Sequence, residues 1–125
     1  MTERESNLTI VERHVEGVTV MTLTGQMVLD DGDLLFWRHI RDLLHEGHVR
    51  ILVNLDGVTF IDSSGVGMLV ARLQTVREKG GAMKLVNGAG SRNQRLLSML
   101  KLNVVFEIFE DEASALRSFM WPAKA

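Results

Sequence analysis

The sequence lacks cysteine, has a single proline, and contains no long apolar run. Without cysteine the chain cannot form disulfides, thiolate zinc sites, iron–sulfur clusters or a cysteine nucleophile. Its apolar stretches are short, and Gly67 interrupts one of them, so none approaches the roughly 20 residues that a membrane-spanning helix needs. The polar residues 1–6 lack the apolar core of a signal peptide. We therefore expect a cytoplasmic protein with no membrane segment.

An excess of charge of one sign is also missing. The 125 residues include 14 lysines and arginines and 16 aspartates and glutamates, which gives a net charge of −2. This balance provides no electrostatic reason to bind nucleic acid or an anionic membrane. The length and the 46% apolar content are typical of one globular domain. We predict a single domain over residues 1–125, with a core at about residues 7–120 and short polar tails.

Short apolar segments predict five strands. Residues 8–15 and 18–24 are expected to pair as an antiparallel hairpin around a turn at Glu16-Gly17, and Gly25 is expected to end the second strand. Residues 49–55 form a branched apolar run typical of a buried parallel strand, which we expect to end at Asp56-Gly57. Residues 82–86 and 104–109 provide the last two predicted strands.

Helical spacing of apolar residues predicts four helices between and after these strands. The first ends at Gly47, and the second, the clearest amphipathic pattern, runs through residues 66–76 and stops at Gly80-Gly81. The third carries Leu96, Leu97 and Leu100, and Asp111 is expected to cap the fourth. The order β-β-α-β-α-β-α-β-α predicts an α/β fold, in which helices pack on a mixed sheet.

The segment Asp62-Ser63-Ser64-Gly65 lies between an apolar strand and the clearest helix. A serine or aspartate there is a good N-cap, because its oxygen accepts a hydrogen bond from a backbone N–H at the helix start. The same N–H groups and the helix dipole favour added negative charge, so a phosphoryl group on a serine would also be stabilised. Gly65 and Gly67 leave the first turn without bulky side chains, so a protein surface or a nucleotide phosphate can approach closely.

Residues 60–69, Phe60-Ile61-Asp62-Ser63-Ser64-Gly65-Val66-Gly67-Met68-Leu69, resemble the signature of the STAS domain family, specifically of bacterial anti-sigma factor antagonists. The resemblance extends to residues 51–58, the Gly80-Gly81 turn, the strand at residues 84–86 and the closing residues 105–119, and so covers nearly the whole chain. It implies a STAS-like mixed sheet and a regulatory protein that is not an enzyme, with no cofactor and no metal.

In this family the serine directly after the aspartate is phosphorylated by a partner kinase of the histidine-kinase-like ATPase fold. The resemblance therefore implies phosphorylation of Ser63. The unphosphorylated antagonist binds this kinase, which is an anti-sigma factor, and a sigma factor or an equivalent client is released. Phosphorylation breaks the binding, and a metal-dependent phosphatase restores it. The resemblance also implies that Asp62 orients the site, that Ser64 is a second hydroxyl position, and that Gly65 and Gly67 allow close docking of the partner.

One segment departs from the family pattern. Many members have acidic residues in a Gly-Glu-Leu-Asp segment that contacts the kinase, whereas Gln26 and Val28 stand at those places here. Either Asp30 or Asp31 supplies the carboxylate to the partner-binding surface, or the surface lacks it. The second case favours an alternative function, a STAS scaffold or ligand-sensing module that is not phosphorylated and binds other signalling proteins. Ser63 would then act only as a helix cap.

Other chemistries have weaker support in the residues. The Gly-x-Gly of residues 65–67 lacks the third small residue and the later acidic residue of a dinucleotide-binding loop. Residues 61–65 are not a Gly-x-Ser-x-Gly elbow, and all four histidines precede them. His45 and His48 straddle a predicted helix end, so their rings need not face one metal. A receiver domain would need an acidic pair after its first strand, and residues 25–27 offer none.

Overall fold

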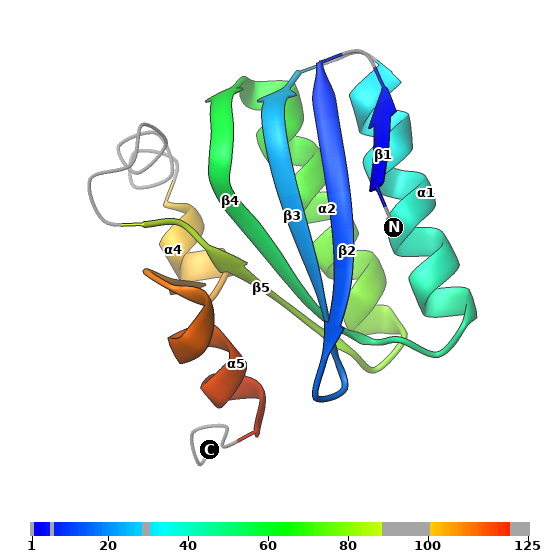
Figure 1. Ribbon diagram of the computed structural model, residues 1–125, viewed down its shortest axis with the longest axis vertical. Helices are drawn as coiled ribbons and strands as arrows, with labels where there is room; N and C mark the ends of the chain where they lie inside the picture. The colour runs from blue at the N-terminus through cyan, green and yellow to red at the C-terminus, as the bar shows by residue number, and fades with distance from the viewer. Residues whose placement is uncertain (1, 6, 29–30, 89–100, 121–125) are drawn as a thin grey trace.

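The computed structural model describes residues 2–5, 7–28, 31–88 and 101–120. Its strands lie side by side in chain order, antiparallel from β1 to β3 and parallel from β3 to β6 (Figure 1). This arrangement confirms the predicted α/β fold with a mixed sheet, but β1 was not predicted, because its residues were assigned to a polar tail. The strands are β1 (Thr2–Glu5), β2 (Leu8–Val15), β3 (Val18–Met27), β4 (Arg50–Ile61), β5 (Ala82–Val86) and β6 (Ile108–Phe109), and the helices are α1 (Asp31–His45), α2 (Ser63–Glu78), α4 (Leu102–Val105) and α5 (Glu112–Met120).

The predicted hairpin forms between β2 and β3. Glu16 and Gly17 have φ angles of 50° and 82°, the left-handed values of a two-residue turn that matches the twist of the strands. The prediction that β3 ends at Gly25 is wrong, because β3 continues to Met27. Its last residues pair with the end of β4, Gln26 with Phe60 and Met27 with Ile61. Gly25 has a φ of 110° and allows the Asn7 carbonyl to approach.

β4 is longer than the predicted strand. Its pairing with β3 is irregular between Thr22 and Thr24, where one partner is Gly57, and the ladder then resumes. Asp56 and Gly57 therefore lie inside an irregular strand and do not end it. The carboxylate of Asp56 accepts a hydrogen bond from the Gly88 N–H at 2.6 Å, which ties the strand to the end of β5. The extra length of β4 carries the chain directly to Asp62.

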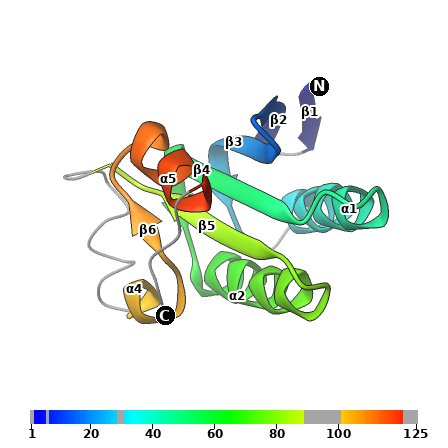
Figure 2. The same cartoon turned by 90° about the horizontal axis from the view of Figure 1, so that it is seen from below.

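Helices cover the two faces of the sheet unequally. α1 and α2 lie together on one face, whereas α5 lies on the other, over β4 and β5 (Figure 2). Right-handed crossovers from β3 to β4 and from β4 to β5 place α1 and α2 on the same side. The larger core includes Ile51, Val53 and Leu69, and the smaller one packs Ala115 and Phe119 against the opposite face. Within the described residues no helix is both long and apolar enough to span a bilayer.

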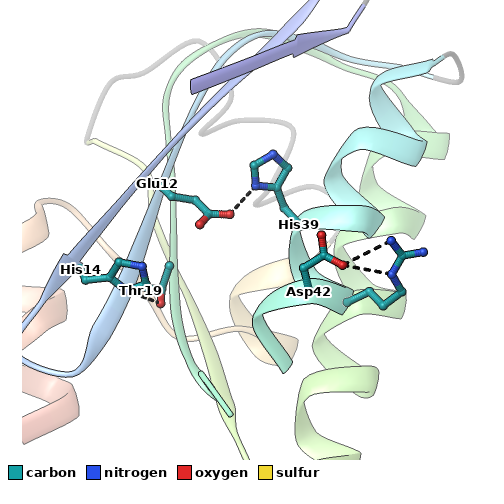
Figure 3. Close-up of polar contacts among 6 residues, drawn as sticks. Glu12, His14, Thr19, His39 and Asp42 are labelled. Carbon is teal, nitrogen blue, oxygen red and sulfur yellow. Dashed lines mark hydrogen bonds and ion pairs between the residues drawn. The ribbon is translucent and has the colours of Figure 1, made fainter. Parts of the chain in front are cut away.

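Polar contacts join the helices to the sheet as well. His39 of α1 is buried and points from the helix to the Glu12 carboxylate of β2 (Figure 3). On the other face, the buried Lys84 amine donates hydrogen bonds to the Ser118 hydroxyl at 2.9 Å and to its carbonyl at 3.3 Å. Because buried polar groups are costly without partners, these contacts fix where each helix sits on the sheet.

Glu112 links α5 to two strands. Its carboxylate accepts hydrogen bonds from Arg13 of β2 at 2.6 Å and from the Asn54 amide of β4 at 2.8 Å. Burial by itself would raise the pKa of Glu112, but these two hydrogen bonds and the Arg13 charge lower the pKa below its ordinary value. The predicted cap of this helix is confirmed, since Asp111 accepts from the Ser114 N–H at 2.7 Å, a bond that lowers the pKa of Asp111.

The predicted strand at residues 104–109 is wrong for most of its length. Residues 102–105 form α4, and only Ile108 and Phe109 pair with β5. Helical spacing buries Leu102 and Phe106, each 3% exposed, and turns Val104 outward. Burial of that pair outweighs the strand preference of the two valines. The predicted helix with Leu96, Leu97 and Leu100 lies outside the described residues.

Candidate functional site

The end of β4 and the start of α2 form the candidate site. Asp62 has an extended backbone, with φ of −98° and ψ of −178°, and its side chain accepts a hydrogen bond from the Gly65 N–H at 2.8 Å. The Asp62 carbonyl accepts from the Val66 N–H at 3.1 Å, the first bond of the helix. Asp62 is therefore the N-cap. The alternative in which Ser63 serves as the cap is wrong.

Ser63 is the first residue of α2, and its side chain is exposed. Ser64 follows it and is half-buried. The first turn of the helix contains no acidic residue, and the carboxylate at the positive end of the helix dipole is that of the N-cap, Asp62. Because Asp62 caps the helix, the Ser63 hydroxyl is not needed as a cap. An exposed hydroxyl at the positive end of a 16-residue helix is well placed to accept a phosphoryl group.

The two glycines of the site have different surroundings. Gly65 is buried, and a Cβ built on it would lie 2.2 Å from the Met27 carbonyl oxygen and 3.1 Å from Cγ2 of Ile61. That same Met27 carbonyl accepts a hydrogen bond from the Asp62 N–H at 3.3 Å. The close approach at Gly65 is thus made by β3 of the same chain. Gly67 is exposed, and a Cβ built there would meet nothing within 4 Å.

Residues beside the motif complete the surface. Phe60 is 52% exposed although it stands only three residues before Ser63, and it pairs in the β3–β4 ladder with Gln26. The sequence placed Phe60 in the motif but gave it no role, although an aromatic residue there was a usable signal. Gln26 is half-buried, Asp31 begins α1, and Asp30 lies outside the described residues.

The histidines lie on β2, on α1 and in the segment that follows α1. Across residues 2–5, 7–28, 31–88 and 101–120, no group of three or more histidine, cysteine, aspartate or glutamate side chains could hold a metal ion. His45 and His48 are both exposed, and the ring of His48 contacts that of His14 with 4.9 Å between centroids. His14 also forms a hydrogen bond with the Thr19 hydroxyl at 3.1 Å (Figure 3).

Comparison with known proteins identifies the family of this chain. The sequence profile of the STAS domain matches residues 9–115. The chain belongs to the STAS domain family. A relative of this STAS protein, "Anti-sigma F factor antagonist" from Paenibacillus polymyxa, is 28% identical over 110 residues, which span 88% of this chain and 93% of the relative.

Solved structures share the fold of this STAS protein. A crystal structure of an anti-sigma factor antagonist from Mycobacterium paratuberculosis superposes with a TM-score of 0.77 at 19% identity, over 89% of this chain and 92% of the other. The Bacillus cell fate determinant SpoIIAA in its phosphorylated form superposes with a TM-score of 0.66 at 19% identity, over 88% and 98% of the two chains. At these identities the likeness establishes the fold alone.

Proposed function

We propose that this protein is an anti-sigma factor antagonist whose binding to a kinase-type anti-sigma factor is switched off by phosphorylation of Ser63. The observation that carries the proposal is the exposed Ser63 hydroxyl at the start of α2, beside an aspartate that already caps the helix. The name of the Paenibacillus relative supports the regulatory class. The proposed partner is an ATPase of the histidine-kinase-like fold, and a metal-dependent phosphatase would remove the phosphate.

The fold suggests how such a switch acts. A phosphoryl group adds about 1.5–2 negative charges at pH 7. The Asp62 carboxylate is one residue away from Ser63, so phosphorylation gathers negative charge on one exposed patch. Leu69, Leu73 and Val76 anchor α2 in the core, and Gly65 anchors its first turn against β3. We therefore expect phosphorylation to change the charge and shape of the surface and to leave the position of the helix unchanged.

The surface that the partner would contact is mixed in character. Ser63 and Gly67 are exposed on the first turns of α2, and Phe60 adds an exposed aromatic ring of the kind that often contributes most to binding. Ser64 lies at the margin of this area, and Asp31 at the start of α1 remains a candidate for the acidic contact. Gly65 is buried and would support the surface from within.

A second candidate function rests on Gln26. Gln26 lies opposite Phe60 in the β3–β4 ladder, where the resemblance to the family implies a carboxylate, and its side chain is an uncharged amide. A non-phosphorylated scaffold or ligand-sensing STAS module would need no such carboxylate. Under this alternative the partners are other signalling proteins, and Ser63 would be unmodified in cells.

The test compares two serines one residue apart. Wild-type protein, Ser63→Ala and Ser64→Ala would each be incubated with ATP and the purified kinase-type anti-sigma factor of the same genome, and phosphate would be located by mass spectrometry. We expect phosphate on wild type and on Ser64→Ala, and none on Ser63→Ala. Calorimetry should show that Ser63→Ala binds the kinase as wild type does and that Ser63→Asp binds more weakly. Phosphate on none of the proteins, with equal binding by both Ser63 variants, would favour the scaffold.

A further inference from the structure

The outer edge of β5 is only partly covered. β6 pairs with Leu85 and Val86 alone, so among the residues that the structure describes Ala82–Lys84 have no strand partner on that side. The Leu85 N–H donates to the Glu107 carbonyl at 3.0 Å, on the β6 side, whereas the Ala82 N–H donates to the Val49 carbonyl, on the β4 side. Successive residues of a parallel strand direct their main-chain groups to alternate sides. The N–H and C=O of Met83 therefore point to the side of β5 that has no strand partner among the described residues, and Met83 as a whole is 3% exposed.

A cavity of about 570 Å³ follows this open edge. Its lining consists of residues 81–84 of β5, residues 104–109 and Arg77 of α2. Had the β5–β6 ladder continued, Phe106 would stand opposite Met83, but α4 turns the chain away at that point. We call this cavity the β5 groove. The β5 groove lies where an N-terminal extension of β6 would pair with β5.

The walls of the β5 groove mix polar and apolar groups, and their three charged residues leave one charge unbalanced. Val104 and Val105 of α4 are 79% and 38% exposed, two of the few large apolar side chains that the described residues expose. Lys84 and Glu107 face each other at 3.5 Å and offset each other's charge. Arg77 remains, with one Nη2 hydrogen bond to the Val105 carbonyl at 3.3 Å and an exposed side chain.

We propose that the β5 groove docks an extended segment of a partner protein that adds to β5 as a further strand. The main chain of that segment would bond to the N–H and C=O of Met83, its small apolar side chains would contact Val104 and Val105, and a carboxylate would lie beside Arg77. Charge favours this occupant, because Arg77 leaves the groove lining with one unbalanced positive charge that a carboxylate of the segment would offset. Residues 102–107 are not expected to pair with this edge themselves, because refolding them as a strand would withdraw Leu102 and Phe106 from the core.

This surface is distinct from the Ser63 site. Ala82 pairs with Arg50 at the start of β4, whereas Ser63 follows Ile61 at the end of that strand. The β5 groove is therefore displaced from Ser63 along nearly the whole length of β4. Failure of either proposal leaves the other unaffected, because the two surfaces share no residue.

Amide hydrogen exchange of the full chain, followed by nuclear magnetic resonance, tests whether the edge is open. We expect the Met83 amide to exchange at least about tenfold faster than the amides of Leu85 and Ala82, which have backbone acceptors. Equal protection of Met83 and Leu85 would overturn the proposal, because it would mean that the chain's own segment covers the edge.

A peptide titration tests the occupant. The probe is a blocked hexapeptide of alternating valine and threonine with one central aspartate, and the control peptide has lysine in place of aspartate. We expect the aspartate peptide to shift and protect the Met83 amide, and the lysine peptide to bind at least about fivefold more weakly. Absence of any shift up to about 1 mM peptide, or shifts confined to residues 60–67, would refute docking in the β5 groove.

Exposed substitutions complete this test without threatening the fold. Arg77→Glu should weaken the aspartate peptide about five- to tenfold and strengthen the lysine peptide, and Val104→Asp should weaken the aspartate peptide. Lys79→Glu makes the same change of charge near the end of the same helix but outside the groove lining, and should have little effect. Equal losses in Arg77→Glu and Lys79→Glu would show that only net charge matters, which would overturn the assigned contact.

Discussion

Alanine substitution of the two glycines in the first turns of α2 should have opposite effects on stability. On helix propensity alone, either substitution stabilises the helix by about 0.5–1 kcal/mol. At Gly67 a Cβ meets nothing within 4 Å, so Gly67→Ala should realise this gain. At Gly65 the Cβ would lie 2.2 Å from the Met27 carbonyl oxygen, far inside van der Waals contact.

The cost at Gly65 follows from what must move. The obstacle is the backbone of β3, and the same Met27 carbonyl accepts the Asp62 N–H, so the end of the strand cannot shift without disturbing the cap. Overpacking of this kind costs about 1–3 kcal/mol. After the propensity gain, we expect Gly65→Ala to lower the free energy of unfolding by up to about 2 kcal/mol. The two variants should then differ by the overpacking cost itself, about 1–3 kcal/mol.

Urea unfolding followed by circular dichroism would measure both free energies under one set of conditions. Gly80→Ala is a control of another kind, since its φ of 80° makes alanine unfavourable although nothing lies within 4 Å. If Gly65→Ala and Gly67→Ala were equally stable, the contact between β3 and α2 would be loose, and our account of how β3 positions Ser63 would be refuted.

Three further predictions concern the N-cap of α2 and the polar contacts that join α5 to the sheet. Asp62→Ala should lower the free energy of unfolding, measured in urea, by about 1 kcal/mol, because the Gly65 N–H loses its acceptor. Asp62→Asn should keep most of the wild-type stability, because asparagine is also a good N-cap. Equal losses in the two variants would contradict this prediction. The folded-state pKa of Glu112 is below its ordinary 4.5, so its contribution is complete above that pH and lost as pH falls through the folded pKa. The free energy of unfolding should therefore fall less steeply with decreasing pH in Glu112→Gln than in wild type. An unchanged pH profile would refute the stabilising role of the Glu112 contacts. Lys84→Met should stay within about 1 kcal/mol of wild type because its apolar stem can be replaced, whereas Lys84→Ala should lose about 1–3 kcal/mol; the reverse order in thermal unfolding would contradict this.

Local signals were sufficient where the chain itself decides its conformation. The Glu16-Gly17 turn and the helix ends at Gly47 and Gly80 were all predicted, because a left-handed backbone is needed there and glycine provides it cheaply. The motif at Asp62 and Ser63 was also recognised, together with the helix that it begins. In each case the determining contacts lie within a few residues of one another.

The same local rules failed where a partner strand decided the outcome. Asp56 and Gly57 are typical turn residues, but β4 continues through them because Val58 and Ile61 pair with the end of β3. The β-branched Val104 and Val105 favour a strand, yet they form α4 because the helical spacing of Leu102 and Phe106 buries both of those residues. Long-range pairing and burial outweigh propensities of about 1 kcal/mol.

The sequence by itself determined the α/β class, the order of most elements and the location of the candidate site, because periodicity, turn chemistry and a short motif are properties of neighbouring residues. Only the tertiary structure showed that Asp62 caps α2 while Ser63 remains exposed, and that Gly65 is required by the Met27 carbonyl of a distant strand. It also revealed the open edge at Met83, which exists because α4 forms where a strand was expected. These features depend on which segments meet in space, and free energies of packing between distant residues cannot be read from the order of the residues alone.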